Sequence, residues 1–264
     1  MLFRVAIVTC PASVSEPDQN RFRFEKYVRA ARRKSARIIC FPEYSLSGYD
    51  PLHITKMAQS NTGVFCASAR KLSETYNITI IAGFIEIYRQ KYFASQLIAT
   101  PNKKIEIYRK IHLAPPEQKK LAAGRKTVIG DIDGVKFGVG LCYDAHFPLL
   151  ATRLAQKGAQ ILFLPHASPN GTSMEKYRSW MRHLPARAFD NSMYVLATNQ
   201  CGTNEAGLSF PAVMVAVGPN GRMIQKYTGA TEKMRIVDLD MAEIARIRTH
   251  PMKYFLANHR ADIG

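Results

Sequence analysis

The sequence predicts a single layered domain of the α/β or mixed α+β class. Segments with strand character alternate with segments of helical spacing along the 264 residues, and turn residues join several neighbouring strands as hairpins. No linker, low-complexity segment or internal repeat of fixed period interrupts this pattern. We therefore expect one domain over residues 1–264, in which residues 241–264 form a C-terminal helix and an extended tail.

The first half of the chain supplies most of the expected hairpin strands. Residues 3–8 form a short apolar run typical of a buried strand, and residues 20–35 carry apolar side chains at helical spacing. The turn Pro101-Asn102-Lys103 joins two strands as a hairpin. The further elements expected here are strands over 37–41, 79–87, 92–100 and 105–109, and a helix over 65–76.

In the second half, residues 134–141 alternate apolar side chains with Lys136 and glycines, as in a strand that is buried on at least one face. Gly158 closes a helix over 149–157, and Pro219-Asn220-Gly221 is a strong hairpin signal. The remaining expected elements are strands over 159–164, 194–199, 213–217, 222–226 and 233–239, the longest helix over 174–191, and a short helix over 241–248.

Composition narrows the class of protein. The formal net charge is +17, which favours a nucleic-acid partner, but the basic residues are spread along the chain and no zinc-finger, RNP or helix-turn-helix pattern accompanies them. We do not expect a nucleic-acid partner, although a catalytically idle nucleic-acid-binding protein stays an alternative. No apolar run reaches the roughly 20 residues of a membrane span, and the N-terminus resembles a strand more than a signal peptide. We expect a cytoplasmic protein.

The five cysteines are odd in number and far apart in sequence, so neither a disulfide framework nor a metal site of closely spaced cysteines is indicated. Reduced thiols are the expectation, and we expect neither a metal nor a cofactor. Cys142 is distinctive because it ends a predicted strand and a turn follows it. That position would hold a sulfur rigidly at the edge of a sheet, with backbone N–H groups nearby. A small apolar cysteine that fills a core is an equally good interpretation of this stretch alone.

Two further polar residues follow predicted strands in the same way, namely Glu43 and Lys110. In layered α/β folds the carboxyl ends of strands share one edge, where ligands usually bind. A carboxylate can take the proton of a thiol, and an ammonium lowers the pKa of the thiol and can stabilise an oxyanion. The N–H of Tyr143 would be a second oxyanion donor, and Glu117 offers a second carboxylate.

Each of these residues also has a simpler interpretation. Glu43 and Glu117 would be ordinary solvated loop charges, and Lys110 the end of a basic strand. Cys-His chemistry is the rival arrangement, because His146 lies four residues after Cys142 and His166 and His183 follow later. Spacing alone does not decide between Cys-His and Cys-Glu-Lys chemistry.

The segments FPEYSLSGYD, YRKIHL and GLCYDAHFP, in this order, resemble the signature segments of the nitrilase, or carbon–nitrogen hydrolase, superfamily. The stretches RSWMRHLPARAFDNSMYVLATNQ, VAVGPNGRMI and DLDMAEIARIRTHPMKYF resemble later parts of the same domain, so the similarity covers nearly the whole chain. The residues after the cysteine resemble the amidase-like branch more than strict nitrilases.

The resemblance implies a four-layer αββα sandwich. It implies that Glu43 is the general base, Lys110 the oxyanion stabiliser and Cys142 the nucleophile, and that Glu117 is a second glutamate that positions substrate or assists proton transfer. Tyr143 would supply the oxyanion N–H. The residues expected to contact substrate are His146, His166 and Tyr49.

The resemblance also implies a homodimer or higher homo-oligomer that pairs through residues 149–157 and 175–189. Leu149 stands where many relatives carry a glutamate, which puts that contact in doubt. The implied reaction is hydrolysis of a small amide to a carboxylic acid and ammonia through a Cys142 thioester. Nitrile hydrolysis and N-carbamoyl amide hydrolysis are the close alternatives, and a scaffold that only pairs with another enzyme is a further class.

Overall fold

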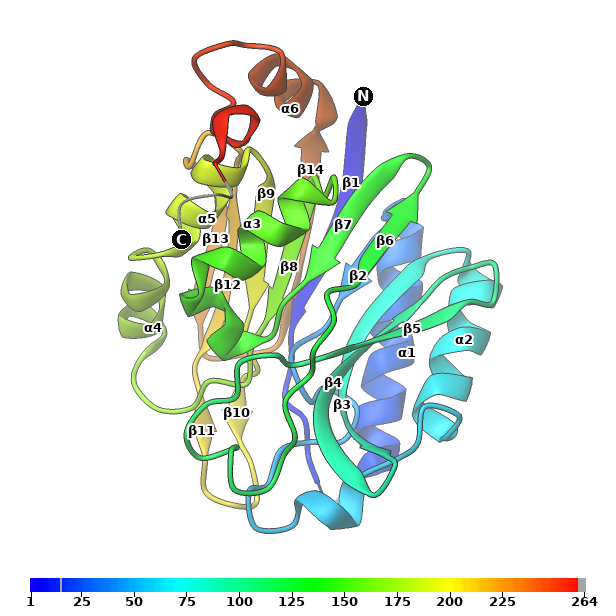
Figure 1. The fold of residues 1–264 in the computed structure, drawn as a ribbon. Helices are drawn as coiled ribbons and strands as arrows, with labels where there is room; N and C mark the ends of the chain where they lie inside the picture. Colours follow the sequence, from blue (N-terminus) through cyan, green and yellow to red (C-terminus); the bar gives the residue numbers. More distant parts are fainter. Residues whose placement is uncertain (15, 261–264) are drawn as a thin grey trace.

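Two six-stranded sheets pack face to face, and helices cover the outer face of each sheet (Figure 1). Residues 1–14 and 16–260 are described by the computed structural model. The arrangement is the αββα sandwich that the resemblance implied, so the predicted fold class is confirmed. Among the described helices we find no apolar span of the length that a bilayer requires.

The first sheet has the order β14-β1-β2-β3-β4-β5. Its three neighbours β1, β2 and β3 run parallel, while β14 and β4 flank them in antiparallel register and β5 pairs antiparallel with β4. The strand bounds are Leu2–Thr9 for β1, Ile38–Cys40 for β2, Thr79–Tyr88 for β3, Lys91–Ala99 for β4, Ile105–Arg109 for β5 and Lys233–Asp240 for β14.

The second sheet repeats this plan with the order β13-β12-β9-β8-β7-β6 and a parallel centre of β7, β8 and β9. Its strands are β6 (Ile129–Ile132), β7 (Val135–Val139), β8 (Ile161–Pro165), β9 (Tyr194–Thr198), β12 (Ala212–Val217) and β13 (Met223–Gly229). A separate two-stranded hairpin pairs β10 (Gly202–Thr203) with β11 (Ser209–Phe210). Because every parallel strand is covered on both faces, the central strands are almost continuously apolar.

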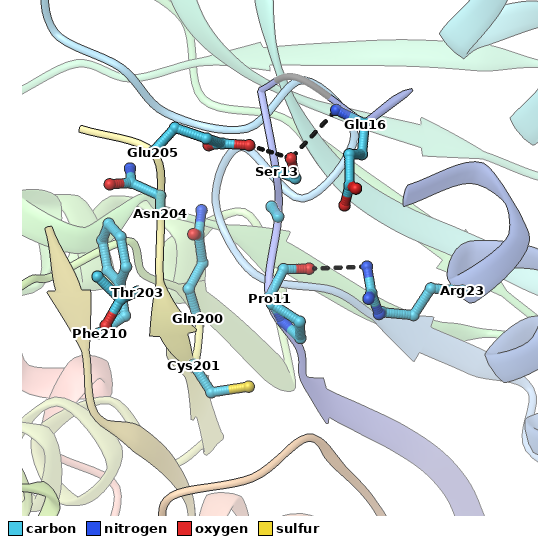
Figure 2. A pocket seen from close by; sticks show the side chains of 11 residues that line it. Pro11, Ser13, Glu16, Arg23, Gln200, Cys201, Thr203, Asn204, Glu205 and Phe210 are labelled. Carbon is cyan, nitrogen blue, oxygen red and sulfur yellow. Dashed lines mark hydrogen bonds between the residues drawn. The ribbon is translucent and has the colours of Figure 1, made fainter. Parts of the chain in front are cut away.

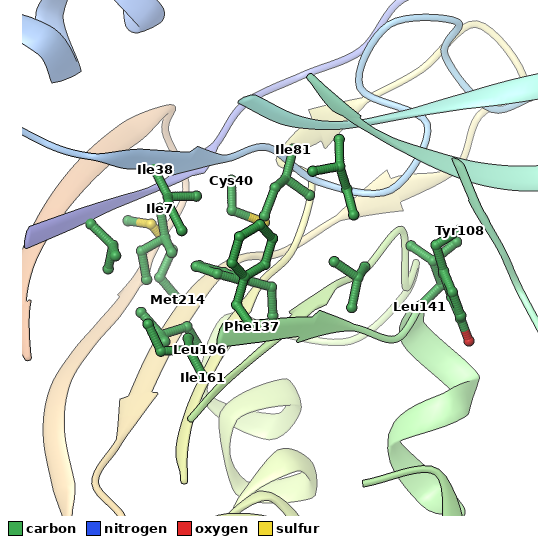
Figure 3. Close-up of a cluster of buried hydrophobic side chains, with 14 of the residues drawn as sticks. Ile7, Ile38, Cys40, Ile81, Tyr108, Phe137, Leu141, Ile161, Leu196 and Met214 are labelled. Atoms are coloured by element: carbon green, nitrogen blue, oxygen red, sulfur yellow. The ribbon is translucent and has the colours of Figure 1, made fainter. Parts of the chain in front are cut away.

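The core lies between the two sheets (Figure 3). Ile7, Ile38 and Ile81 project from the first sheet toward Phe137, Ile161 and Leu196 of the second, and all six side chains are buried. Two further apolar clusters lie outside the sheets, under the helices. The helices α1 (Pro17–Arg33) and α2 (Val64–Tyr76) cover the first sheet, and α3 (Pro148–Gln156), α4 (Ser173–Trp180) and α5 (Leu184–Asn191) cover the second.

The single long helix expected over residues 174–191 was wrong, because the structure divides it into α4 and α5. Pro185 lies in the first turn of α5. Inside a continuous helix its ring would clash with the carbonyl of Met181 and its missing N–H would leave that carbonyl without a partner, so the helix ends and restarts. The longest helix is instead α1, with 17 residues.

Several short elements were not predicted. These are β6, β10 and β11, which have four residues or fewer and carry almost no periodic signal. The predicted helix after β14 is confirmed as α6 (Met241–Arg248), and a single turn over Phe255–Asn258 follows in the tail that we expected to be irregular. Residues 261–264 of that tail lie outside the described part of the chain.

The chain architecture brings four strand ends to one edge of the sandwich. Glu43 and Lys110 follow β2 and β5 of the first sheet, and Cys142 and His166 follow β7 and β8 of the second. The two sheet edges meet there, because the backbone N–H of Ala167, just after β8, donates to the Glu43 carboxylate at 2.9 Å. Side chains from both sheets therefore converge on one site.

Candidate active site

A cavity of about 380 Å³ opens at the edge where the strand ends meet. The cavity is lined by all eight residues predicted for the site, namely Glu43, Tyr49, Lys110, Glu117, Cys142, Tyr143, His146 and His166. The remaining lining comes from Pro51 in the loop after β2, the loop after β5, the loop after β8, α4 and Leu208. The structure thus brings together residues that are far apart along the chain.

Lys110 joins the two carboxylates of the cavity. Its Nζ donates to Glu43 Oε1 at 2.8 Å and to Glu117 Oε1 at 3.0 Å. Lys110 and Glu43 are each only 1% exposed, and Glu117 is buried as well. A buried charge is tolerated only when it is paired and hydrogen-bonded, and this ammonium meets both conditions through two carboxylates.

Glu43 is fixed by the backbone around it. Its second oxygen, Oε2, accepts the N–H of Ala167, and its own carbonyl accepts a hydrogen bond from Gln200 Nε2 at 2.7 Å. The loop after β2 lies directly on β3, where a Cβ on Gly83 would come within 2.3 Å of the Tyr44 backbone nitrogen. The absence of a side chain at Gly83 therefore allows the loop to pack closely enough to place the Glu43 carboxylate.

Glu117 has a separate set of contacts. The hydroxyl of Tyr44 donates to Oε1 at 2.7 Å, and the backbone N–H of Ala114 donates to Oε2 at 2.8 Å. The Tyr44 ring stacks on Tyr49, with the ring centroids 4.7 Å apart. Glu117 is thus held in one orientation toward Lys110 by neighbours on two different loops.

Cys142 begins a 3₁₀ helix over Cys142–His146, directly after β7. Its φ is +43°, a left-handed conformation that a residue with a side chain adopts at a cost of about 1–3 kcal/mol. The buried Asp144 holds this bend, since its carboxylate accepts hydrogen bonds from the Leu141 N–H at 2.8 Å, the Tyr108 hydroxyl at 2.7 Å and the His112 N–H at 2.9 Å. The strained backbone at the thiol is therefore stabilised by a fully satisfied carboxylate.

The first residues of this helix also leave a donor available. The initial N–H groups of any helix have no intrahelical acceptor. The N–H of Tyr143 belongs to this group, and among the hydrogen bonds of the described chain none uses it. An N–H beside the thiol is thus available to an oxygen atom in the cavity.

Burial and neighbouring charge shift the titration of the three central groups. Burial raises the pKa of the Cys142 thiol well above its usual value and the Glu43 carboxylate adds to the rise, while Lys110 opposes it. Burial also raises the pKa of Glu43 to about 7, against the opposing effect of Lys110. For Lys110, burial disfavours the charge, but Glu43, Cys142 and Glu117 together outweigh it and hold the pKa well above its usual value. The resting site thus combines a neutral thiol with a permanent ammonium and a carboxylate that titrates near neutral pH.

The other predicted residues form the walls. His166 is buried, and its Nδ1 lies 2.7 Å from the Leu164 carbonyl, so Nδ1 carries the proton and Nε2 is an acceptor. Its ring packs on Trp180 with centroids 4.2 Å apart, and burial holds its pKa well below the usual value. His146 packs against Tyr143 and His183, and burial lowers its pKa too. Neither histidine makes a contact that would assign it to the thiol as a base.

Sequence reasoning missed three residues of this site. Asp144 lies inside the GLCYDAHFP segment, but nothing in its spacing indicated that it holds the bend. Trp180 and Lys176 come from α4, and both line the cavity. Both lie in the segment that we expected to be one long helix, and nothing in its spacing indicated that they face the cavity.

A second cavity, of about 430 Å³, is lined by residues from the start of the chain and from the segment after β9 (Figure 2). It contains Cys201, whose pKa burial raises to about 12, and it has no lysine. Gln200 lines this cavity and supports the Glu43 backbone. The cavity therefore lacks the pairing of thiol, ammonium and carboxylate found around Cys142.

No group of three or more His, Cys, Asp or Glu side chains in residues 1–14 and 16–260 is arranged to hold a metal ion. The five cysteines are all free thiols in the structure.

The fold and the site define a class of protein, an αββα sandwich in which a thiol, an ammonium and two carboxylates share one cavity at the strand ends. Comparison with known families agrees with this class, because the carbon-nitrogen hydrolase model matches residues 4–249. The chain belongs to the carbon–nitrogen hydrolase family. The resemblance noted in the sequence is thereby confirmed.

Curated relatives of similar length include amidases. The (R)-stereoselective amidase of a Pseudomonas species is 27% identical and is matched over 80% of this chain and 76% of its own. The 2-oxoglutaramate amidase of Bacillus subtilis is 26% identical, over 94% of this chain and 95% of its own. A nitrilase of Pyrococcus abyssi is 26% identical and is matched over 99% of this chain and 98% of its own.

Solved structures share the fold at low sequence identity. A CN-hydrolase superfamily protein from Xanthomonas campestris, which carries an arsenic adduct in its active site, superposes with a TM-score of 0.89 at 20% identity and covers 100% of this chain and 99% of its own. An amidase from a Nesterenkonia species gives a TM-score of 0.83 at 23% identity, over 98% of this chain and 94% of its own.

Proposed function

We propose that this protein is a thiol-dependent hydrolase that converts a small amide and water to a carboxylic acid and ammonia. The observation that carries the proposal is the position of Lys110, whose Nζ lies 2.8 Å from Glu43 and 3.0 Å from Glu117 in the cavity that Cys142 lines. This arrangement places a nucleophile, a base and a cation around one small volume. The amidases among the curated relatives support the same reaction class.

In the first half of the reaction, the Glu43 carboxylate takes the proton of the Cys142 thiol, and the sulfur attacks the amide carbonyl carbon. The raised pKa of Glu43 makes its carboxylate a stronger base for this proton, and the ammonium of Lys110 favours the thiolate that forms. The Lys110 ammonium and the free N–H of Tyr143 stabilise the oxyanion of the tetrahedral intermediate. Protonated Glu43 then gives its proton to the leaving nitrogen, and ammonia departs from a thioester.

In the second half, a water molecule gives a proton to Glu43 and attacks the thioester carbon. The same oxyanion donors act again, and collapse of the intermediate releases the carboxylic acid and returns the proton to the sulfur. Glu117 positions the Lys110 ammonium throughout, because it is its second carboxylate partner. Removal of one oxyanion donor in such a site costs about 10²–10³ in rate.

Nitrile hydrolysis is the close second candidate, since the same thiolate can attack a C≡N carbon, and one of the relatives is a nitrilase. N-carbamoyl amides are a third substrate class for the same groups. The chain around Cys142 resembles amidase-like relatives more than strict nitrilases, which favours the amide.

The decisive experiment measures ammonia release from a panel of small amides, nitriles and N-carbamoyl compounds, with wild type and Cys142→Ala. We expect Cys142→Ala to lower kcat by about 10⁴-fold or more, as the removal of other nucleophiles does. Cys66→Ala is the matched control, because Cys66 is buried in α2 away from the cavity. Mass spectrometry of the wild type under turnover should detect an acyl group on Cys142. Near-normal turnover by Cys142→Ala would end the proposal.

We further propose that residues 1–264 act as one catalytic domain, and that the protein works in the cytoplasm, where reduced thiols persist. We also propose that two copies pair through α3 and α5. Leu149 on α3 and Phe189 on α5 are 55% and 46% exposed, as expected for apolar side chains that a second copy covers. Light scattering of the purified protein tests the pairing, and cell fractionation tests the location.

A further inference from the structure

Lys176 is the remaining charged side chain of the cavity. Of the described residues that line it, Glu43, Lys110 and Glu117 form one ion-paired group, and Lys176 on α4 is the only other one with a full charge. We propose that the substrate is an amide with a carboxylate at the end remote from the scissile bond, and that Lys176 binds this carboxylate. This inference deepens the proposed function and rests on it.

The position of Lys176 is well defined by its contacts. Its Nζ donates to Ser168 Oγ at 2.8 Å and to the Pro169 carbonyl at 3.1 Å. The segment that carries these acceptors is itself held by the buried Asn199, which accepts the Ser168 N–H at 2.8 Å and donates to the Ser168 carbonyl at 3.0 Å. An ammonium has three N–H donors, so two are used and one remains for a ligand.

The charge of Lys176 has no counter-ion within the described part of the chain. Both of its partners are neutral oxygens, and no carboxylate of the described residues forms an ion pair with it. The adjacent carboxylate, Glu175, is occupied at the start of α4, where it accepts the Thr172 N–H at 2.8 Å in a capping box. A ligand that brings a negative charge into the cavity would therefore supply the counter-ion that the described chain does not.

The surroundings strengthen this attraction. Lys176 is half-buried, and burial lowers the pKa of its ammonium, which reflects the cost of keeping a charge in this place. The histidines of the cavity, His146 and His166, have pKa values below the usual range and do not compete for an anion at neutral pH. An anionic group near Lys176 thus meets a single, partly desolvated cation, and such charge-assisted hydrogen bonds are among the stronger ones.

The geometry also connects Lys176 with the reacting sulfur. Both line the same cavity, and a negative charge on Cys142 would favour the charged form of Lys176. Trp180, on the same helix as Lys176, packs on His166 and forms an apolar wall. A substrate that places its amide at Cys142 and its carboxylate at Lys176 has to fit within this cavity of about 380 Å³, which favours short acid monoamides.

A purely structural role for Lys176 would be a tether between α4 and the loop after β8. Such a tether needs hydrogen-bond donors but no charge, and its loss would affect all substrates alike. The two roles are therefore separated by comparing an anionic amide with an uncharged amide of the same shape.

The test measures kcat and KM for succinamate and for 4-methylpentanamide, in which an isopropyl group replaces the carboxylate, and for glutaramate and 5-methylhexanamide as a longer pair. We expect the wild type to prefer an anionic amide. In Lys176→Met, the ratio of kcat/KM for the anionic amide to that for its neutral isostere should fall about 10- to 100-fold, mainly through KM, as expected for loss of one charge-assisted hydrogen bond. Lys176→Arg should restore most of the ratio, because it keeps the charge.

Arg178→Met is the matched control, because Arg178 is an exposed cation on the same helix but does not line the cavity. The ratio of kcat/KM for the anionic amide to that for its neutral isostere should be the same in Arg178→Met as in the wild type. A wild type that prefers the neutral amides, or a Lys176→Met ratio that does not change, would overturn this inference while the amidase function stands. Failure of every amide to release ammonia, with no acyl group on Cys142, would overturn the proposed function and this inference with it.

Discussion

The charge of Glu117 should contribute to the pH at which the enzyme becomes active. In the proposed mechanism Glu43 acts as a carboxylate, so kcat/KM rises with pH as Glu43 loses its proton, and its pKa of about 7 predicts half-maximal activity near that pH. The negative charge of Glu117 contributes to raising this pKa, after burial. Glu117→Gln keeps a side chain of the same shape but removes that charge, so the acid limb of the profile should move to lower pH.

The size of the shift follows from the geometry. Both carboxylates contact Lys110 Nζ, at 2.8 and 3.0 Å, so their nearest oxygens are at most about 6 Å apart. With an effective dielectric constant of about 20, two unit charges at that separation repel by about 3 kcal/mol, which corresponds to about two pH units. We expect the acid limb of the kcat/KM profile to move to lower pH by about one to two pH units, because screening reduces the repulsion between the two carboxylates.

The assay is the pH dependence of kcat/KM for the best amide of the panel, in wild type, Glu117→Gln and Glu25→Gln. Glu25 is an exposed glutamate on α1, so its variant should reproduce the wild-type profile. Because the neutral amide in the Glu117→Gln variant attracts Lys110 less than the carboxylate does, the maximal rate of that variant should fall as well. A limb that stays in place, or moves to higher pH, would show that Glu117 does not act on the ionisation of Glu43.

Two further substitutions test how the site is built. Gly83→Ala would bring a Cβ within 2.3 Å of the Tyr44 nitrogen. It should therefore lower the free energy of unfolding in urea by about 1–3 kcal/mol, and it should lower kcat by displacing Glu43. An unchanged urea midpoint and an unchanged kcat would mean that the loop moves away from the new Cβ without a loss of stability or activity. Asp144→Asn removes one acceptor oxygen, so at least one of the groups that donate to Asp144 loses its partner. Thermal unfolding should therefore show a free energy of unfolding lower by about 2–3 kcal/mol, and kcat should fall. Normal stability and rate in that variant would show that the bend at Cys142 does not depend on the carboxylate.

Sequence patterns were reliable for the long, apolar elements. The central strands of both sheets appeared near their predicted positions because a strand buried on both faces is a continuous apolar run, which is a strong signal. The patterns failed for β6, β10 and β11, which are too short to show a period, and for the break between α4 and α5. There the effect of Pro185 on the preceding turn outweighed the helical spacing of the flanking residues.

The eight candidate site residues were named from the sequence, but different signals led to them. Glu43, Lys110 and Cys142 were found because each follows a predicted strand, and strand ends gather at one edge of a layered sheet. Lys176 carried no such signal, since a lysine on a predicted helix is usually a solvated charge. Its place in the cavity, beside Ser168 and Pro169 and without a counter-ion among the described residues, distinguishes it from the solvated cations of this basic chain.

By itself the sequence determined which residues have reactive chemistry and where the apolar strands that carry them end, because these depend on residue type and local pattern. The tertiary structure decided that the ends of two separate sheets meet, that one lysine bridges two glutamates, and that a second lysine faces the same cavity without a counter-ion among the described residues. These properties depend on contacts between residues far apart along the chain, and neither local spacing nor composition contains the distances that determine them.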